Sequence, residues 1–261
     1  IIAMNKKEES NSPFHKLLDE SNPIRRCGYK ILRNDHGLFK DLKSDFSKHL
    51  EKSLEKFVGD DISQDFRLES YHNFLLQKKI NHHDFIKNTS RILPDSFLNH
   101  PFIHQLVDIA SKATNQKLKV YKDKLEFRVV RPDMEDNNPL HRDSWFPYFV
   151  PLINVYVPLA GSFCDSAMKI VPFSHEWTDD EVKPTFTYEE SAEGKKFINP
   201  KTGVAYSVPE IDSTTKNIIP HRPDVLEGDF MLFSPLMVHG GGNNTSDCTR
   251  FSFEIRLEID N

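Results

Sequence analysis

The sequence predicts an α+β fold in which an antiparallel double-sheet barrel is backed by N-terminal helices. Three observations support this prediction. Apolar residues recur at three- and four-residue steps in the first part of the chain, short β-branched and aromatic runs follow from about residue 118, and strands do not alternate with helices. We therefore expect one domain over residues 1–261, with 1–117 mainly helical and 118–261 forming a double-stranded β-helix, the jelly-roll of cupin-like proteins.

The predicted helical part contains three amphipathic segments after a polar, irregular stretch at 1–30. The first spans 38–58 and the second passes through Phe66, Tyr71, Phe74 and Leu75. The third follows Pro94, where Asp95 or Ser96 is a suitable N-cap. The apolar face of the first segment consists of Leu38, Phe39, Leu42, Phe46, Leu50, Leu54 and Phe57.

The predicted strands are short runs bounded by Pro or Gly. They are LEFRVVRP (125–132), LINVYVPLAG (152–161), SAMKIVPFS (166–174), GDFMLFSPLMVHGG (228–241) and TRFSFEIRLEI (249–259). In the last run, apolar residues alternate with Arg250, Ser252, Glu254 and Arg256, which predicts a strand with two chemically different faces. Residues 176–222 are polar and weakly patterned, so we expect an insertion or a lid there.

The composition argues against nucleic-acid and membrane partners and favours a small molecule. The formal net charge of −5 and a pI of about 6.2 indicate no nucleic-acid footprint and no polybasic membrane patch. The three cysteines (Cys27, Cys164 and Cys248) are scattered, and no apolar run reaches the roughly 20 residues of a membrane span. We expect a cytoplasmic protein with a small-molecule partner. The oligomeric state is not indicated.

Three histidine–x–carboxylate pairs are candidates for metal binding. His49-Leu50-Glu51 lies within the first predicted helix, where residues i and i+2 point in different directions. His82-His83-Asp84 has no strand beside it, and we interpret it as a solvated turn or a helix cap. His141-Arg142-Asp143 lies between two predicted strands, and an extended backbone places its two outer side chains on the same side.

Downstream residues select the third pair. His239 ends an apolar run and is followed by glycines, which allow close backbone approach. Two imidazoles and one carboxylate form the facial triad of non-haem iron oxygenases, which leaves positions open on the metal. Arg250 opens the last predicted strand with Ser252 on the same face, and a guanidinium suits the distal carboxylate of a small diacid.

The ordered motifs NPLHRDSWFPYFVP, INVYVPLAG, SAMKIVPFSHEW and VHGGGNNTSDCTRFS resemble the phytanoyl-CoA dioxygenase family of 2-oxoglutarate oxygenases over about residues 120–258. Phe173 stands where the family usually has the glycine of P-G-S-H. The resemblance implies the following site residues: His141, Asp143 and His239 as iron ligands, Arg250 and Ser252 on 2-oxoglutarate, and Tyr156 and Phe127 lining the same pocket.

The resemblance also implies the cofactors and the reaction. It predicts Fe(II), 2-oxoglutarate and O2, with succinate and CO2 released as a small metabolite is hydroxylated. Relatives that halogenate carry a small residue in place of the metal-binding carboxylate, so Asp143 favours hydroxylation, desaturation or cyclisation. A cupin-like metalloenzyme that does not use 2-oxoglutarate, and a catalytically silent jelly-roll binding protein, are the alternatives.

Several residues near the motifs permit two interpretations. Arg131 and Arg142 either meet an acidic substrate or are solvated loop residues. Trp145, Phe146 and Tyr148 either form an aromatic wall of the substrate pocket or serve packing. We interpret His175 and His221 as structural or exposed.

Overall fold

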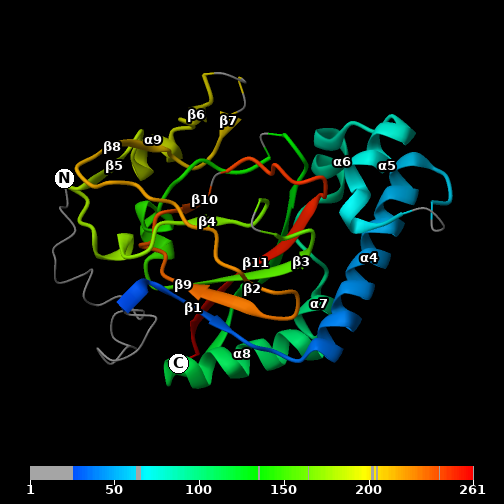
Figure 1. Ribbon diagram of the computed structural model, residues 1–261, viewed down its shortest axis with the longest axis horizontal. Coiled ribbons are helices and arrows are strands. Elements are labelled where there is room, and N and C mark those ends of the chain that lie inside the picture. The colour runs from blue at the N-terminus through cyan, green and yellow to red at the C-terminus, as the bar shows by residue number, and fades with distance from the viewer. Residues whose placement is uncertain are drawn as a thin grey trace.

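A computed structural model describes residues 26–62, 66–134, 136–163, 165–200, 203, 205–240 and 242–260. The polar stretch predicted at 1–30 lies mostly outside these residues, as does Cys164. The described part combines a helical N-terminal region with a large antiparallel sheet (Figure 1). The α+β class is therefore confirmed.

The helices form where apolar residues recur on one face. The elements are α4 (His36–Val58), a 3-10 turn at Leu68–Ser70, α5 (Tyr71–Lys78), α6 (His82–Thr89), α7 (Asp95–Leu98) and α8 (Pro101–Thr114). Asp35 caps α4 by accepting the backbone N–H groups of Gly37 and Leu38, and Gly59 ends it in the left-handed conformation. The predicted cap of the third segment was wrong: the segment splits, and α8 begins at Pro101 with His100 as its cap.

The main sheet has the order β1-β9-β3-β11-β2, with every neighbouring pair antiparallel. Its strands are β1 (Tyr29–Leu32), β9 (Phe230–Phe233), β3 (Ile153–Ala160), β11 (Arg250–Ile259) and β2 (Leu118–Val130). Strand β11 lies between β3 and β2, and on its polar face Arg250 and Ser252 are buried while Glu254 and Arg256 are half-buried. Both Arg250 and Arg256 line the cavity described below.

The second sheet of the predicted jelly-roll is short. It consists of β4 (Lys169–Ile170) paired with β10 (His239–Gly240), and single bridges extend it on both sides, from His239 to His141 and from Ile170 to His221. Four chain segments thus lie side by side in this second sheet, in the order His141, β10, β4 and His221. The described residues do not show a closed barrel, so the double-stranded β-helix stays a prediction.

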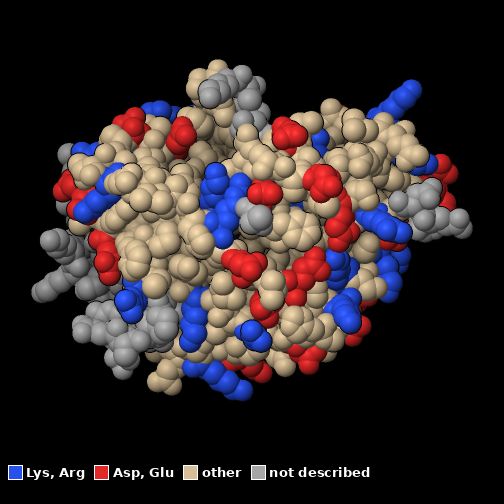
Figure 2. Space-filling view, in the orientation of Figure 1, with Lys and Arg blue, Asp and Glu red and all other residues tan. Residues whose placement is uncertain are grey.

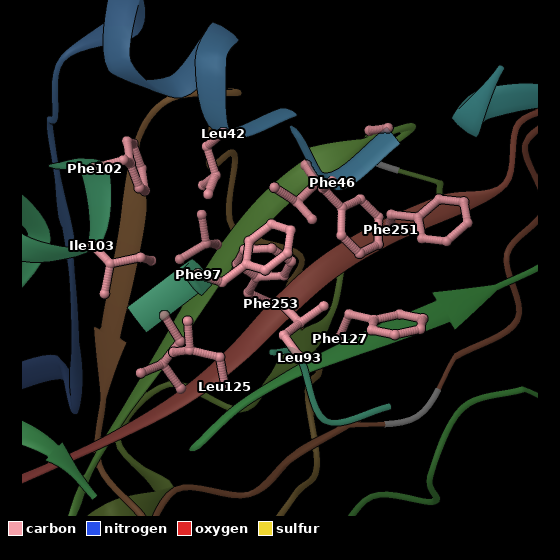
Figure 3. Packing of buried hydrophobic residues seen from close by; sticks show 14 of the residues in the cluster. Leu42, Phe46, Leu93, Phe97, Phe102, Ile103, Leu125, Phe127, Phe251 and Phe253 are labelled. Carbon is pink, nitrogen blue, oxygen red and sulfur yellow. The ribbon is translucent and has the colours of Figure 1, made fainter. Parts of the chain in front are cut away.

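The hydrophobic core lies between the helices and one face of the main sheet. The ring of Phe46 from α4 packs 5.2 Å from that of Phe127, 5.6 Å from that of Phe251 and 5.4 Å from that of Phe253. Figure 3 shows these rings meeting between helix and strands. Because side chains alternate along β11, this packing turns Arg250, Ser252, Glu254 and Arg256 to the opposite face.

The segment predicted as an insertion or lid forms small paired elements. They are β5 (Val182–Pro184), α9 (Tyr188–Ala192), β6 (Phe197–Ile198), β7 (Ala205–Tyr206) and β8 (Ile211–Thr214), with β5 paired to β8 and β6 paired to β7. Figure 1 shows β6 and β7 projecting from the body of the molecule. Val208, just after β7, lines the cavity described below. The segment is therefore an insertion that reaches the site, and its movement as a lid stays a prediction.

The surface agrees with the near-neutral composition. On the face shown in Figure 2, basic and acidic side chains of the described residues lie interspersed over the surface. Among these residues, no helix combines the length and the apolar character that crossing a membrane requires.

Candidate metal centre

His141, Asp143 and His239 meet at the edge of the short second sheet. His141 and His239 exchange two backbone hydrogen bonds of 3.0 and 2.9 Å, and this bridge sets their rings 4.5 Å apart. The Oδ1 atom of Asp143 lies 3.4 Å from Nε2 of His141 and 3.9 Å from Nε2 of His239. Neighbouring ligands of one transition-metal ion lie about 3 Å apart when each is about 2.1 Å from it. One ligand atom from each residue lies within 4.8 Å of the others, so the three can bind one ion if they move closer together.

The second ring nitrogen of each histidine is already bonded. Nδ1 of His141 lies 2.8 Å from the carbonyl oxygen of Pro139, and Nδ1 of His239 lies 2.9 Å from that of Met237. Because a carbonyl oxygen only accepts, each Nδ1 carries the proton and each Nε2 presents a lone pair. Burial and the neighbouring His141 lower the pKa of His239 to about 4, so this ring is neutral at neutral pH, as a metal ligand must be.

Two residues hold the other carboxylate oxygen of Asp143. Asn154 donates to Oδ2 at 2.9 Å and Arg256 donates to it at 3.2 Å. Burial alone would raise the pKa of Asp143, but the charge of Arg256 and the contact with His141 hold it well below the ordinary value. The carboxylate is thus ionised and oriented, with Oδ1 turned toward the histidines.

The backbone between the first two ligands is fixed by a buried arginine. Arg142 has extended dihedral angles (φ −116°, ψ 133°), which place His141 and Asp143 on the same side, as predicted. Its guanidinium, fully buried, donates to the carbonyl oxygen of Trp177 at 3.0 Å and to Asp179 at 3.2 Å. Arg142 is therefore neither a solvated residue nor a substrate ligand; it ties the metal pair to the loop at 177–179.

Gly240 allows the two histidine segments to approach each other. Its φ of +106° lies in the left-handed half of the map, and a Cβ there would stand 2.7 Å from the carbonyl oxygen of Pro139 and 3.0 Å from Nδ1 of His141. This confirms the predicted close approach behind His239.

A cavity of about 250 Å³ opens beside the triad, and Arg250 and Tyr156 line it. The guanidinium of Arg250 donates to the carbonyl oxygen of Ser166 at 2.9 Å and to Oδ1 of Asn137 at 3.2 Å, and lies 5.9 Å from the ring centre of Tyr156. Nε of Arg250 and Oγ of Ser252 are buried without a hydrogen-bond partner among the described residues. Because Arg250 lines the cavity, its unpaired Nε is available to a ligand bound there.

Ser252 and Phe127 differ from the prediction in their placement. Ser252 shares the strand face of Arg250 but is not among the residues that line the cavity. Phe127 is opposite Phe253 in the β2–β11 register and packs on Phe46, so the core encloses it on the helical side of the sheet (Figure 3). A ring on that face cannot line the co-substrate pocket, and the prediction for Phe127 was wrong.

Asn154 and Arg256 are site residues that the sequence reasoning missed. The signals were present, because Asn154 shares its strand face with Tyr156, and Arg256 shares one with Arg250. Of the two interpretations given for Trp145, Phe146 and Tyr148, packing fits the structure better, because none of the three lines the cavity. Phe149 lines the cavity, with the Arg256 guanidinium 4.1 Å from its ring centre, whereas Phe146 and Tyr148 cluster with Tyr188.

The competing histidines are engaged elsewhere. His49 lies within α4. His82 is not solvated: it is buried in the first turn of α6, with Nδ1 3.0 Å from the hydroxyl of Tyr71. His175 is buried and His221 is exposed. Arg131 pairs with Asp136 at 2.8 Å. Among the described residues, His141, Asp143 and His239 are the group able to hold a metal ion.

Comparisons with known proteins agree with this geometry. The family model described as "Phytanoyl-CoA dioxygenase (PhyH)" matches residues 25–252. No curated protein sequence matches. Among solved structures, apo ThoJ, a non-haem monooxygenase, has a TM-score of 0.53 at 13% identity, with 92% of this chain and 77% of that chain covered. At this identity the likeness concerns the fold alone.

Two further solved structures have lower scores. AviO1 from Streptomyces viridochromogenes Tue57 has a TM-score of 0.48 at 17% identity, covering 91% of each chain. SnoK, a non-haem α-ketoglutarate-dependent carbocyclase from nogalamycin biosynthesis, has a TM-score of 0.47 at 18% identity, covering 93% of this chain and 84% of that chain. The assignment does not depend on them. Because the family model spans the triad, Arg250 and most of the chain, this protein belongs to the phytanoyl-CoA dioxygenase (PhyH) family, whose members use Fe(II), 2-oxoglutarate and O2.

Proposed function

We propose that this protein is an Fe(II)- and 2-oxoglutarate-dependent oxygenase that hydroxylates a small metabolite. The observation that carries the proposal is the buried triad, with both Nε2 atoms and Oδ1 of Asp143 converging beside a cavity. His141, Asp143 and His239 would hold the iron. When iron, 2-oxoglutarate and O2 are bound, they supply the oxidising chemistry, and 2-oxoglutarate is converted to succinate and CO2.

The residues of the cavity suit the co-substrate. A distal carboxylate near Arg250 would supply an acceptor for the orphaned Nε of Arg250. The contacts of Arg250 to Ser166 and Asn137 hold the guanidinium plane in advance of binding. The protein's own contribution is thus to orient: Arg250 holds one end of the co-substrate, and Asn154 with Arg256 orients the ligand carboxylate.

The ligand carboxylate also bears on the outcome of the reaction. Asp143 occupies the position that small residues take in halogenating relatives, which favours oxygenation. Known structures of similar fold include enzymes described as a monooxygenase, a carbocyclase and an epimerase. We propose hydroxylation because it requires only a C–H bond in the substrate, whereas cyclisation also requires a second reacting group.

Two measurements test the proposal. Addition of 2-oxoglutarate to the anaerobic Fe(II) protein should produce a metal-to-ligand charge-transfer absorption band, and its absence would exclude 2-oxoglutarate chelation. Asp143→Ala should abolish succinate release and Arg250→Ala should weaken 2-oxoglutarate binding. Normal turnover by Asp143→Ala would favour a protein in which the triad is not the reaction centre.

A further inference from the structure

Most of the charged residues that line the metal cavity form ion pairs, and one carboxylate has no such partner among the described residues. Glu254 receives two hydrogen bonds from Arg128, of 2.9 and 2.8 Å. Arg256 donates to Asp143. Arg250 is assigned to the co-substrate under the proposed function. The remaining charged residue of the lining is Glu126, whose carboxylate forms no ion pair or hydrogen bond with the described residues.

The fold itself gives Glu126 no evident structural role. In the β2–β11 register Glu126 lies directly opposite Glu254, and like charges opposite each other on neighbouring strands are destabilising. The charges of Arg91, Arg128 and Arg256 act on both carboxylates. The hydrogen bonds of Arg128, from Nε and one terminal nitrogen, go to Glu254 and not to Glu126. Arg91 lies beside Glu126, next to the Ile92–Glu126 bridge, yet the two form no ion pair.

Glu126 also lies where two cavities meet. A second cavity of about 340 Å³ adjoins the metal cavity, and the two share Glu126, Arg128, Asn138 and Val208 as lining residues. Val208 belongs to the inserted segment after β7. A molecule entering from the outer cavity toward the metal would therefore pass the Glu126 carboxylate. A metal cavity of about 250 Å³, which must also hold the co-substrate, restricts the part of the substrate near the metal to a few atoms.

We propose that Glu126 is the specificity residue of this site and that the substrate is a small molecule with a protonated amine, held by Glu126 where the two cavities meet. This inference rests on the proposed function, because it assigns the substrate class of the same site. A protonated amine would supply the hydrogen-bond donor that the Glu126 carboxylate lacks among the described residues, in a charge-assisted hydrogen bond. The amine anchors the molecule, and the remainder extends toward the triad.

The test compares amines with the same molecules after the charge is removed. L-amino acids and small primary amines, each beside its N-acetyl derivative, are screened for stimulation of succinate release by the Fe(II)- and 2-oxoglutarate-loaded protein. We expect stimulation by members of the amine set and not by their acetylated partners. Glu126→Gln should raise KM for the stimulating amine roughly 10- to 100-fold, as expected for loss of a hydrogen bond to a charged group.

Two controls separate this role from a structural one. Glu258→Gln makes the same change on β11, at a glutamate 3.9 Å from Lys119 near the far end of the sheet, and should leave KM unchanged. The melting temperature of Glu126→Gln should stay close to that of the unmodified protein, because the Glu126 carboxylate forms no ion pair or hydrogen bond with the described residues and Gln keeps its shape. A marked fall in melting temperature, with amine selectivity retained, would show that Glu126 serves the fold.

The two proposals fail in different ways. Absence of the charge-transfer band with 2-oxoglutarate in the unmodified protein would overturn the proposed function. If the band forms in the unmodified protein and in Glu126→Gln, three outcomes would overturn the amine assignment alone. They are equal stimulation by the acetylated compounds, stimulation by neither set, and an unchanged KM in Glu126→Gln.

Discussion

The hydrogen bond from Asn154 to Asp143 offers a direct test of how the metal centre is held. Asn154→Ala removes a donor 2.9 Å from the oxygen of Asp143 that faces away from the histidines. Both side chains are almost fully buried, with 3% exposure each, so solvent replaces this bond poorly. Arg256 remains on the same oxygen at 3.2 Å and retains part of the orientation.

The size of the effect follows from the charge of the acceptor. A hydrogen bond to a buried carboxylate contributes about 1.5–3 kcal/mol, and loss of a residue that orients a metal ligand lowers metal affinity about 10- to 100-fold. Because Arg256 remains, we expect the lower end, near tenfold. The assay is an anaerobic titration with Fe(II), repeated with Co(II) as a spectroscopic probe of the ligand set.

A second buried asparagine supplies the control. Asn244 donates to the backbone carbonyls of Val130 and Cys248 and is fully buried, but it makes no contact with the triad. Asn244→Ala should lower the free energy of unfolding while leaving metal affinity unchanged. Equal metal affinities in Asn154→Ala and the unmodified protein would refute the view that Asn154 orients Asp143.

Three further predictions concern backbone strain and pH. Gly240→Ala should lower metal affinity at least about tenfold, because the new Cβ would stand 3.0 Å from Nδ1 of His141; an Fe(II) titration checks this. Phe173→Gly should raise the free energy of unfolding by about 1 kcal/mol in urea denaturation, because Phe173 has φ +67° and a side chain there is strained; an equal or lower value would contradict it. Burial, aided by Arg131, lowers the pKa of His82 to about 4. The unfolded chain therefore binds the proton first, and stability should fall as pH drops from 6.5 toward 4, by up to about 3 kcal/mol; in His82→Asn this part of the pH dependence should disappear.

Phe173 also explains how the chain departs from its family. The family's usual glycine at this position suits a left-handed backbone, and this chain keeps that backbone with a phenylalanine that is 49% exposed. The loop shape is thus preserved at some cost in stability, and the neighbouring Ser174 and His175 stay buried.

Local patterns in the sequence were sufficient for much of the fold and for the residues of the candidate metal site. Helical periodicity located α4, and alternation located β11 with its two faces, because both depend only on residue spacing. The H-x-D spacing and the distant His239 located the three residues that the structure brings together as a possible metal site, because an extended backbone at Arg142 places His141 and Asp143 on one side.

Tertiary structure decided what no local pattern specifies, namely which face of each strand meets which partner. Phe127 carried no sign that its face turns to Phe46, because that depends on where α4 packs. Arg142 could not be recognised as a buried clamp, since its partners at Trp177 and Asp179 lie in a later loop. The unpaired state of Glu126 follows from the β2–β11 register, which places it opposite Glu254 while Arg128 is already engaged. Spacing determines the chemistry that a strand can offer, whereas register and packing determine which of its groups remain available to a ligand.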